Sequence, residues 1–271
     1  MPGGEIEIER GRAPAGRRLS ADDTAHIRER ASLVKVFAHR GGRAWAPENT
    51  MAAFKRALEA RVDGIELDVQ RAASGELVVF HDADLSRTTN GVGPLADASY
   101  DELLKLSAGG WFSDEFAGEK VPLLADVLAL VDGACTLNIE VKNAPVAYNG
   151  IEEELLALLE DYPHKHQVII SSFDHHVLKR LSSLGSTCAL ALLMDGILLD
   201  LPGALEAVGA SFYHPCLGSC REDVVELCHS VGVSVNGWTA NNRSLWLSAL
   251  KMGLDGIVSD EPEALLRYLG R

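Results

Sequence analysis

The sequence predicts an α/β protein built as a single (β/α)8 TIM barrel, and three observations favour this fold class. The chain has 271 residues, close to the ~250 that one barrel of this kind typically contains. From Leu33 onward, short β-rich runs alternate with helical patterns, as in proteins with a parallel sheet. The number of these units is eight, which favours a closed barrel over an open sheet.

Eight segments are expected to form the barrel strands. They are residues 35–40, 64–70, 135–142, 167–173, 188–194, 211–215, 233–239 and 255–259. The segment Pro47-Glu48-Asn49-Thr50 is interpreted as the start of the first helix, with Asn49 or Thr50 as its N-cap, rather than as a set of substrate ligands. This helix carries an apolar stripe at helical spacing, formed by Met51, Phe54, Leu58 and Val62.

Two segments after the second strand depart from this alternation. Residues 76–82 follow the turn Ala73-Ser74-Gly75 and are predicted to pair with that strand as a β-hairpin. Residues 83–121 lack clear periodicity and are predicted to form an inserted loop region beside the barrel mouth. Residues 1–32 are predicted to be a polar N-terminal extension with a short helix capped by Ser20, and residues 33–271 to be the barrel domain.

Composition limits the class of partner. The formal net charge is −14, from 39 acidic and 25 basic residues, which argues against a nucleic-acid groove or an anionic membrane surface as the main partner. The sequence shows neither an apolar leader nor the ~18 consecutive apolar residues of a membrane span. We therefore expect a cytoplasmic protein without stable membrane insertion, whose five cysteines are reduced thiols.

Two predicted strands carry carboxylates on the face opposite their apolar residues. Glu66 and Asp68 are two residues apart, so their side chains point the same way, and Glu140 is placed similarly on the next strand. Buried carboxylates are costly unless they are neutralised, and hard divalent cations prefer oxygen ligands. The pattern predicts that Glu66, Asp68 and Glu140 bind one divalent cation, either Mg²⁺ or Ca²⁺.

Two histidines are predicted to converge on these carboxylates. His39 ends the first strand, at the end of the barrel where catalytic groups of this fold gather. A hairpin turn near Ser74 would place residues 80–81 opposite residues 67–68, so that His81 lies beside the acidic pair. An isolated histidine is usually structural, but the convergence of three segments favours a catalytic site.

These groups suit the cleavage of a phosphodiester. The reaction needs the charge of the diester neutralised, a nucleophile deprotonated and the leaving alkoxide protonated. Two imidazoles could perform the two proton transfers, and Arg40 or Lys142, together with the cation, could stabilise the developing charge. Lys142 could instead pair structurally with the acids. Trp238 ends the seventh strand, where its indole would face the mouth.

The motifs that contain these residues resemble, in order, those of the glycerophosphodiester phosphodiesterase family. They are His39-Arg40-Gly41, Pro47-Glu48-Asn49-Thr50, Glu66-Leu67-Asp68, Val79-Phe80-His81-Asp82, Leu85-Ser86-Arg87-Thr88-Thr89, Asn138-Ile139-Glu140-Val141-Lys142 and Trp238-Thr239. The resemblance covers residues 33–271, and this many ordered motifs on predicted strands are a specific signal.

The resemblance implies a barrel related to phosphatidylinositol-specific phospholipase C. It also implies metal-dependent hydrolysis of small glycerophosphodiesters, such as glycerophosphocholine or glycerophosphoethanolamine, to sn-glycerol 3-phosphate and an alcohol. The residues that it implies are, by role, Glu66, Asp68 and Glu140 for the cation, His39 and His81 as acid and base, Arg40 and Lys142 for the phosphate, and Trp238 for the substrate pocket.

Two alternative functions remain open from the sequence. A phospholipase D that acts on lysophospholipids would need an apolar track for an acyl chain, and the insertion with Trp111, Phe112 and Phe116 is the candidate for that track. A barrel that only binds phosphodiesters would not require two proton-transfer groups. Head-group preference, the choice of ion, the division of acid and base between the histidines and the oligomeric state are not predicted.

Overall fold

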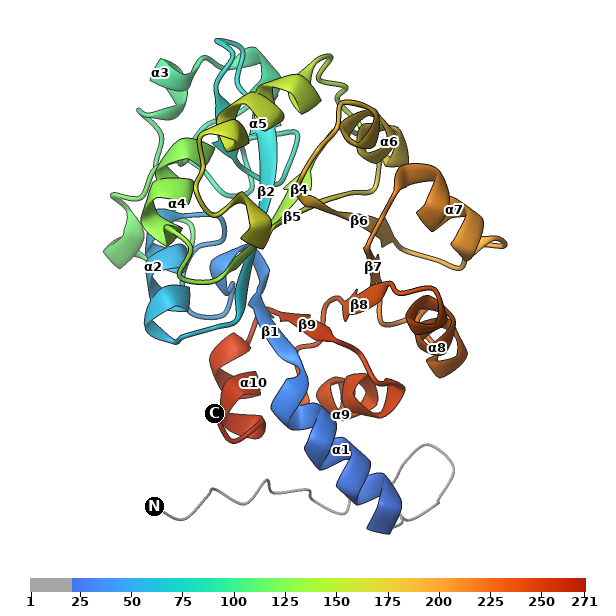
Figure 1. Cartoon of the computed structure of the whole chain (residues 1–271). Helices are drawn as coiled ribbons and strands as arrows, with labels where there is room; N and C mark the ends of the chain where they lie inside the picture. The colour runs from blue at the N-terminus through green and yellow to red at the C-terminus, as the bar shows by residue number, and fades with distance from the viewer. Residues whose placement is uncertain (1–20) are drawn as a thin grey trace.

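The computed structural model describes residues 21–271, and eight parallel strands form a closed ring at its centre (Figure 1). Neighbouring strands pair in the order β1-β9-β8-β7-β6-β5-β4-β2, and a further pairing between β1 and β2 closes the ring. The predicted (β/α)8 barrel is therefore confirmed. The ring strands are β1 (Lys35–Ala38), β2 (Gly64–Arg71), β4 (Thr136–Val141), β5 (Val168–Ser172), β6 (Ala189–Met194), β7 (Phe212–Pro215), β8 (Ser234–Gly237) and β9 (Gly256–Ser259).

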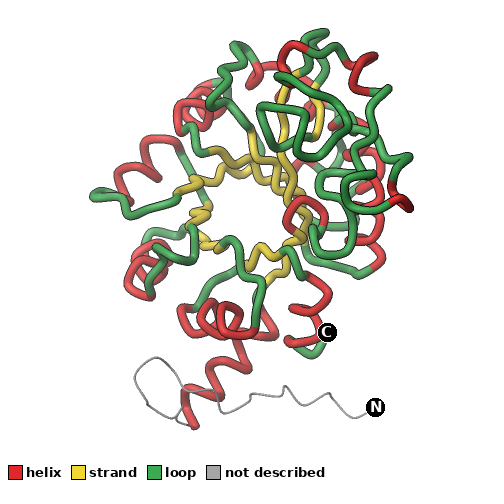
Figure 2. The backbone as a smooth tube through the Cα atoms, turned by 180° about the vertical axis from the view of Figure 1, so that it is seen from behind, coloured by secondary structure: helices red, strands yellow, loops and turns green. Residues whose placement is uncertain are grey.

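Helices surround the ring, so strands form the inner layer and helices the outer one (Figure 2). On β2, Ile65, Leu67 and Val69 belong to the main hydrophobic core, and Glu66 and Asp68 alternate with them as predicted. The helices that follow the strands are α2 (Met51–Glu59), α4 (Leu124–Val131), α5 (Ile151–Glu160), α6 (His175–Ser183), α7 (Leu201–Val208), α8 (Glu222–Ser230), α9 (Arg243–Met252) and α10 (Pro262–Tyr268).

The predicted hairpin is present after β2. The short strand β3 (Leu77–Val79) pairs antiparallel with β2, and Val79 is the partner of Val69. One residue further along, the backbone N–H of Phe80 donates to the carbonyl of Asp68 at 3.0 Å. Residues 80–81 thus lie opposite residues 67–68, which is the predicted register. The hairpin therefore delivers residue 81 to the side of the ring where the acidic residues of β2 lie.

The insertion after the hairpin contains short helical pieces rather than regular elements. These are η2 (Leu95–Asp97), α3 (Tyr100–Leu103) and η3 (Asp114–Phe116). The insertion has a small hydrophobic core of its own, in which Leu85, Leu95 and Leu103 pack against Val78 and Phe80 of the hairpin. Its lack of periodicity in sequence follows from these short elements, and its packing joins it to the hairpin.

An N-terminal helix, α1 (Ala21–Leu33), precedes the first strand and packs against α9. Ile27 and Ala31 are buried, and Arg30 donates a hydrogen bond to the carbonyl of Leu254 at 2.7 Å. The short helix expected in the N-terminal extension is therefore present. Its expected cap, Ser20, and the remainder of the extension lie outside the described residues, and the domain division between residues 32 and 33 stays a proposal.

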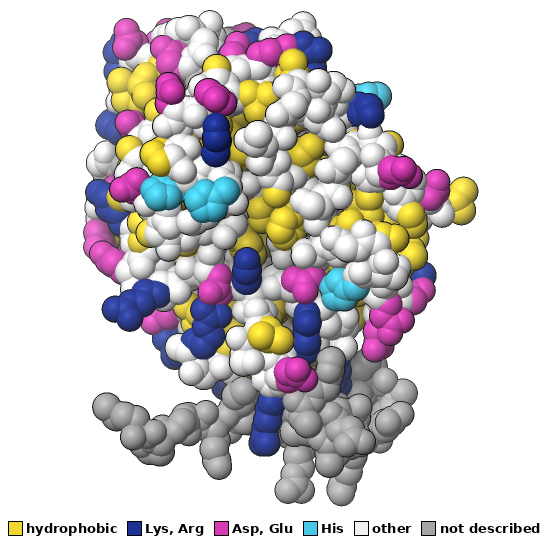
Figure 3. All heavy atoms as spheres, viewed as in Figure 1, with side chains coloured by type: hydrophobic (Ala, Val, Ile, Leu, Met, Phe, Trp, Pro, Cys, Tyr) yellow, Lys and Arg dark blue, Asp and Glu magenta, His cyan; other side chains and the backbone are white. Residues whose placement is uncertain are grey.

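The surface carries charges of both signs. On the face shown in Figure 3, acidic and basic side chains are interspersed, with hydrophobic side chains between them. Within residues 21–271, no helix combines the length and the apolar character needed to cross a membrane.

Truncation of a leucine between helix and barrel should destabilise the fold. Leu155 of α5 is fully buried in the main core, whereas Leu199 is fully exposed. We expect Leu155→Ala to lower the free energy of unfolding by about 2 to 5 kcal/mol, because it removes buried methyl groups and leaves a cavity. Urea denaturation measures this loss. The matched control Leu199→Ala should change it by less than about 0.5 kcal/mol, and equal losses would contradict the assignment of the core.

Candidate active site

The first strand ends in a turn that directs two polar side chains toward the barrel mouth. His39 and Arg40 begin this turn, in which Arg40 has a φ of 50° and Gly41 has a φ of 83°. A Cβ atom on Gly41 would lie 2.7 Å from the Cβ of Ala53, so only glycine fits at this position. The His-Arg-Gly sequence therefore determines how both side chains leave the strand.

Three carboxylates lie together at the mouth. Glu66 and Asp68 come from β2 and Glu140 from the neighbouring β4. All three are buried, and one carboxylate oxygen from each lies within 4.8 Å of those from the other two. Burial, followed by repulsion from the other two carboxylates, raises the pKa of Glu66 well above its usual value. Burial also raises the pKa of Glu140, to about 7. The cluster thus favours added positive charge, and its oxygen-only donor set fits a hard divalent cation.

Lys142 and Arg40 supply part of this positive charge. The Nζ of Lys142 lies 3.0 Å from Asp68 Oδ1 and also pairs with Glu140, so the structural pairing considered for this lysine is present. The Nε of Arg40 lies 3.2 Å from Asp68 Oδ2. Burial tends to raise the pKa of Asp68, but Lys142 and Arg40 hold it far below its usual value. Two cationic side chains thus face the three buried carboxylates.

His39 is held by an aspartate that follows the last strand. Its Nδ1 lies 2.5 Å from Asp260 Oδ1, and its Nε2 lies 3.8 Å from Glu66 Oε2. Burial tends to raise the pKa of Asp260, but the hydrogen bond with His39 lowers it, so this carboxylate is ionised and can only accept. The proton of His39 therefore sits on Nδ1, which leaves the Nε2 lone pair on the side of the acidic cluster. Burial also lowers the pKa of His39.

His81 forms a second pair of the same kind. It follows β3, and its Nδ1 lies 2.5 Å from Oδ1 of Asp82. Burial lowers the pKa of His81, while the negative charge of Asp68 opposes that shift. Burial tends to raise the pKa of Asp82, but hydrogen bonds with Arg87 and His81 lower it to about 2. His81 therefore also carries its proton on Nδ1 and has Nε2 free.

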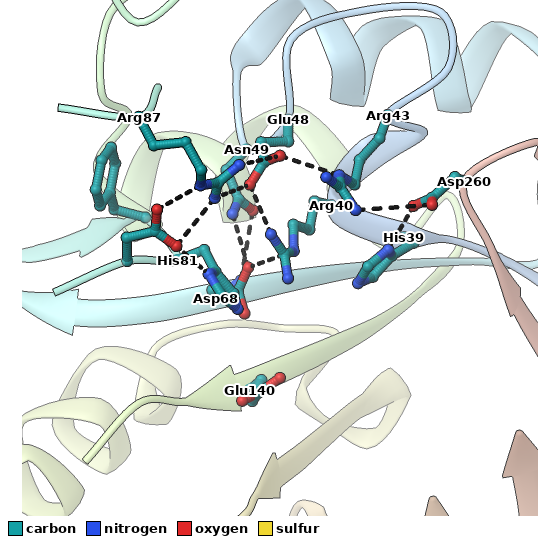
Figure 4. Close-up of polar contacts among 12 residues, drawn as sticks. His39, Arg40, Arg43, Glu48, Asn49, Asp68, His81, Arg87, Glu140 and Asp260 are labelled. Carbon is teal, nitrogen blue, oxygen red and sulfur yellow. Dashed lines mark hydrogen bonds and ion pairs between the residues drawn. The ribbon is translucent and has the colours of Figure 1, made fainter. Parts of the chain in front are cut away.

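Glu48 lies between the two His–Asp pairs (Figure 4). Its side chain is buried and accepts hydrogen bonds from three arginines. Arg40 donates at 2.6 Å, Arg43 at 3.0 Å, and Arg87 through two nitrogens at 2.7 and 3.0 Å. Burial tends to raise the pKa of Glu48, but Arg87 and Arg40 bring it down to about 2.

The neighbours of Glu48 in the sequence have two functions in the structure. Thr50 is the N-cap of α2, because its side chain accepts a hydrogen bond from the Ala53 N–H. However, Glu48 binds the three arginines, and the Nδ2 of Asn49 donates to Asp68 Oδ2 at 2.7 Å. The predicted helix start with Thr50 as its cap is therefore confirmed, and two further residues of the same segment hold side chains of the site.

A cavity of about 380 Å³ opens between these groups. Its apolar wall comes from the other side of the ring, where Phe173, Leu193 and Trp238 lie at the ends of β5, β6 and β8. The rings of Phe173 and Trp238 meet edge to face, with centroids 5.5 Å apart. Of the residues that the structure describes, those lining the cavity do not include the insertion aromatics Trp111, Phe112 and Phe116.

Seven of the eight residues predicted for the site line this cavity, and the eighth, Asp68, is fully buried within the acidic cluster. The residues that the sequence analysis did not assign are mainly those that hold the predicted site residues in place through hydrogen bonds. Asp260 carried a signal, because it directly follows the last barrel strand, where functional groups of this fold gather. His214 on β7, another lining residue, was not assigned, and burial lowers its pKa to about 3.

The fold and the site are those of a (β/α)8 barrel with two histidines and three carboxylates at its mouth. Residues 39–264 match the model of the glycerophosphoryl diester phosphodiesterase family. A glycerophosphodiester phosphodiesterase of Caldanaerobacter subterraneus subsp. tengcongensis is 40% identical over 235 residues, which are 86% of this chain and 97% of that protein. The chain therefore belongs to the glycerophosphoryl diester phosphodiesterase family and is a phosphoric diester hydrolase.

Solved structures agree with this assignment. An Oleispira antarctica phosphodiesterase, in complex with the product sn-glycerol-3-phosphate, superposes with a TM-score of 0.82 at 30% identity, covering 89% of this chain and 98% of that one. A glycerophosphodiester phosphodiesterase from Agrobacterium tumefaciens superposes with a TM-score of 0.75 at 30% identity, covering 86% of this chain and 99% of that one.

The low pKa of Glu48 should appear in the pH dependence of stability. Its pKa is about 2 in the folded protein against a usual 4.5, so its contribution is present above pH 4.5 and is lost as the pH falls toward 2. We expect a loss of about 2 kcal/mol in the free energy of unfolding between pH 6 and pH 3 from this group. Urea denaturation of the wild type and Glu48→Gln across this range isolates it, and parallel pH profiles for the two proteins would contradict it.

Proposed function

We propose that this chain is a metal-dependent glycerophosphodiester phosphodiesterase. Its substrates would be small diesters such as glycerophosphocholine or glycerophosphoethanolamine, and its products sn-glycerol 3-phosphate and an alcohol. The observation that carries this proposal is the convergence of two His–Asp pairs on one acidic cluster. The product bound in the Oleispira antarctica relative supports the same chemistry.

We propose that Glu66, Asp68 and Glu140 hold one divalent cation, either Mg²⁺ or Ca²⁺. When bound, the cation would supply Lewis-acid stabilisation of negative charge on the phosphoryl oxygens. Arg40 and Lys142 would hold the phosphate, since both line the cavity and already face its carboxylates. A phosphate oxygen would then share these cationic groups with Asp68, which keeps the substrate next to the acidic cluster.

The two histidines would perform the proton transfers. Each has its Nδ1–H engaged by an aspartate, so each presents a free Nε2 as the proton acceptor or, once protonated, as the donor. One would remove a proton from the attacking oxygen, and the other would deliver a proton to the leaving alkoxide. His39 and His81 come from different ends of the network in Figure 4, as two roles on opposite sides of one phosphate require.

Trp238 would line the substrate pocket together with Phe173. This apolar wall faces the charged one across the same cavity, which suits a substrate with a phosphate at one end and a weakly hydrated group at the other. The acyl-chain track considered for a lysophospholipid substrate would need the insertion aromatics, and Trp111, Phe112 and Phe116 contact one another instead.

The cytoplasmic location stays a prediction. The five cysteines are unpaired in the structure.

Release of sn-glycerol 3-phosphate from glycerophosphocholine and glycerophosphoethanolamine is the direct test. We expect release that stops when EDTA removes the cation and returns when Mg²⁺ or Ca²⁺ is restored, because the buried carboxylates need the positive charge. A coupled assay for sn-glycerol 3-phosphate measures it. Activity that EDTA leaves unchanged would contradict the metal, and folded protein without turnover on either diester would favour a lysophospholipid substrate or a binding role.

The acid–base roles are tested by substitution of the two histidines. We expect His39→Ala and His81→Ala each to lower turnover of glycerophosphocholine by at least ~100-fold, because each removes one proton-transfer group. His176 is exposed at the start of α6, so His176→Ala is the matched control and should leave turnover unchanged. Circular dichroism verifies that the variants are folded. Near-normal turnover in either active-site variant would remove that residue from the mechanism.

A further inference from the structure

We propose that Glu48 is a positioning residue that orients both His–Asp pairs at once, through Arg43 on one side and Arg87 on the other. The inference rests on the proposed roles of His39 and His81, and adds that one buried carboxylate holds the supports of both. Figure 4 shows this network of contacts, with Glu48 in the middle and His81 and His39 on opposite sides.

The first branch leads to His39. The Nε of Arg43 donates to Glu48 Oε2 at 3.0 Å, and the Nη1 of the same guanidinium lies 3.7 Å from Asp260 Oδ2. Asp260 uses its other oxygen to accept from His39. A second donor, Asn241, contacts Asp260 Oδ2 at 2.7 Å. This branch therefore has a support besides Arg43, and its loss should be partly compensated.

The second branch leads to His81 and has fewer supports. Arg87 donates to both oxygens of Glu48, at 2.7 and 3.0 Å, and also binds both oxygens of Asp82, with its Nη2 at 3.0 Å from Oδ1. Asp82 Oδ1 in turn binds His81. Arg87 belongs to the insertion and Glu48 to the loop before α2, so the insertion reaches the catalytic groups through this residue.

The geometry of Glu48 fits a hub rather than a surface ion pair. Its side chain is 2% exposed, whereas those of Arg43 and Arg87 are 36% and 41% exposed. A buried carboxylate is costly unless it is paired and hydrogen-bonded, and both oxygens of Glu48 are used. Its third partner, Arg40, reaches Asp68, so Glu48 also holds the arginine proposed to bind phosphate.

Steady-state kinetics on glycerophosphocholine test this proposal with Glu48→Gln, Arg43→Gln, Arg87→Gln and their combinations. We expect each single variant to lower kcat more than it changes KM. The kcat of Arg87→Gln should be lower than that of Arg43→Gln, because Asn241 also supports Asp260 in the branch that leads to His39. In the Glu48→Gln background, either arginine substitution should add less than about a 3-fold further loss, since residues of one network are not additive. The matched control is Arg180→Gln, which breaks the ion pair between Arg180 of α6 and Glu153 of α5. This variant should leave kcat unchanged.

A substrate with a p-nitrophenol leaving group separates the branches, because that group leaves without needing a proton. With sn-glycerol 3-(p-nitrophenyl phosphate), one of the two arginine variants should recover toward wild-type kcat and the other should not. Recovery of one variant only would support one arginine for each histidine and identify the acid. Recovery of both, or of neither, would overturn that division.

Two results would overturn the proposal while the proposed function stands. One is a kcat for Glu48→Gln within about 2-fold of the wild type, and the other is fold losses that multiply across Glu48 and the arginines. If Glu48→Gln fails to fold, the kcat values of Arg43→Gln and Arg87→Gln test the proposal, because both arginines are partly exposed. A wild-type kcat in both variants would overturn the proposal. Failure of the proposed function has a different signature, namely a wild type without turnover or histidine variants that stay active.

Discussion

The burial of three neighbouring carboxylates is the constraint on which the rest of this site depends. One oxygen atom from each of Glu66, Asp68 and Glu140 lies within 4.8 Å of the other two. In these low-dielectric surroundings, the ionised form of each carboxylate is unfavourable unless positive charge is near. Lys142 and Arg40 supply positive charge beside Asp68, and they lower its pKa as a result. The pKa values of Glu66 and Glu140 remain raised, so additional positive charge would be favourable at this point of the barrel mouth.

The parts of the site that could be predicted from the sequence are those that depend on strand geometry. Alternation along β2 and β4 places Glu66, Asp68 and Glu140 on the inner face, because neighbouring side chains of a strand point to opposite sides. The register of the hairpin places His81, because antiparallel pairing from a short turn leaves little freedom. Both features are local, and both follow from the period of a strand and the length of a turn.

The pairings that could not be predicted join distant segments of the chain. Asp260 reaches His39 across 221 positions of the chain, and Arg87 reaches Glu48 across 39. No period or spacing specifies such pairs, since they form only when the ring closes and the insertion packs on the hairpin. Glu48 was taken for part of a helix start because Thr50 beside it is a true cap. A polar segment can thus serve a helix and a site at once.

The mouth is divided into two arcs with different origins. Charged residues come from β1, β2, the hairpin and β4, whereas Phe173, Leu193 and Trp238 come from β5, β6 and β8. The residues proposed for proton transfer and phosphate binding and those proposed for the pocket wall therefore come largely from separate stretches of the chain, with Asp260 after β9 as an exception. Under the proposed function, substitutions of Leu193 or Trp238 would change which alcohol fits, whereas Phe173 lies against Lys142, with Nζ 5.8 Å from its ring centroid, and links the two arcs. Such a division would allow the wall of the pocket to change while the groups proposed to act on the phosphate ester stay the same.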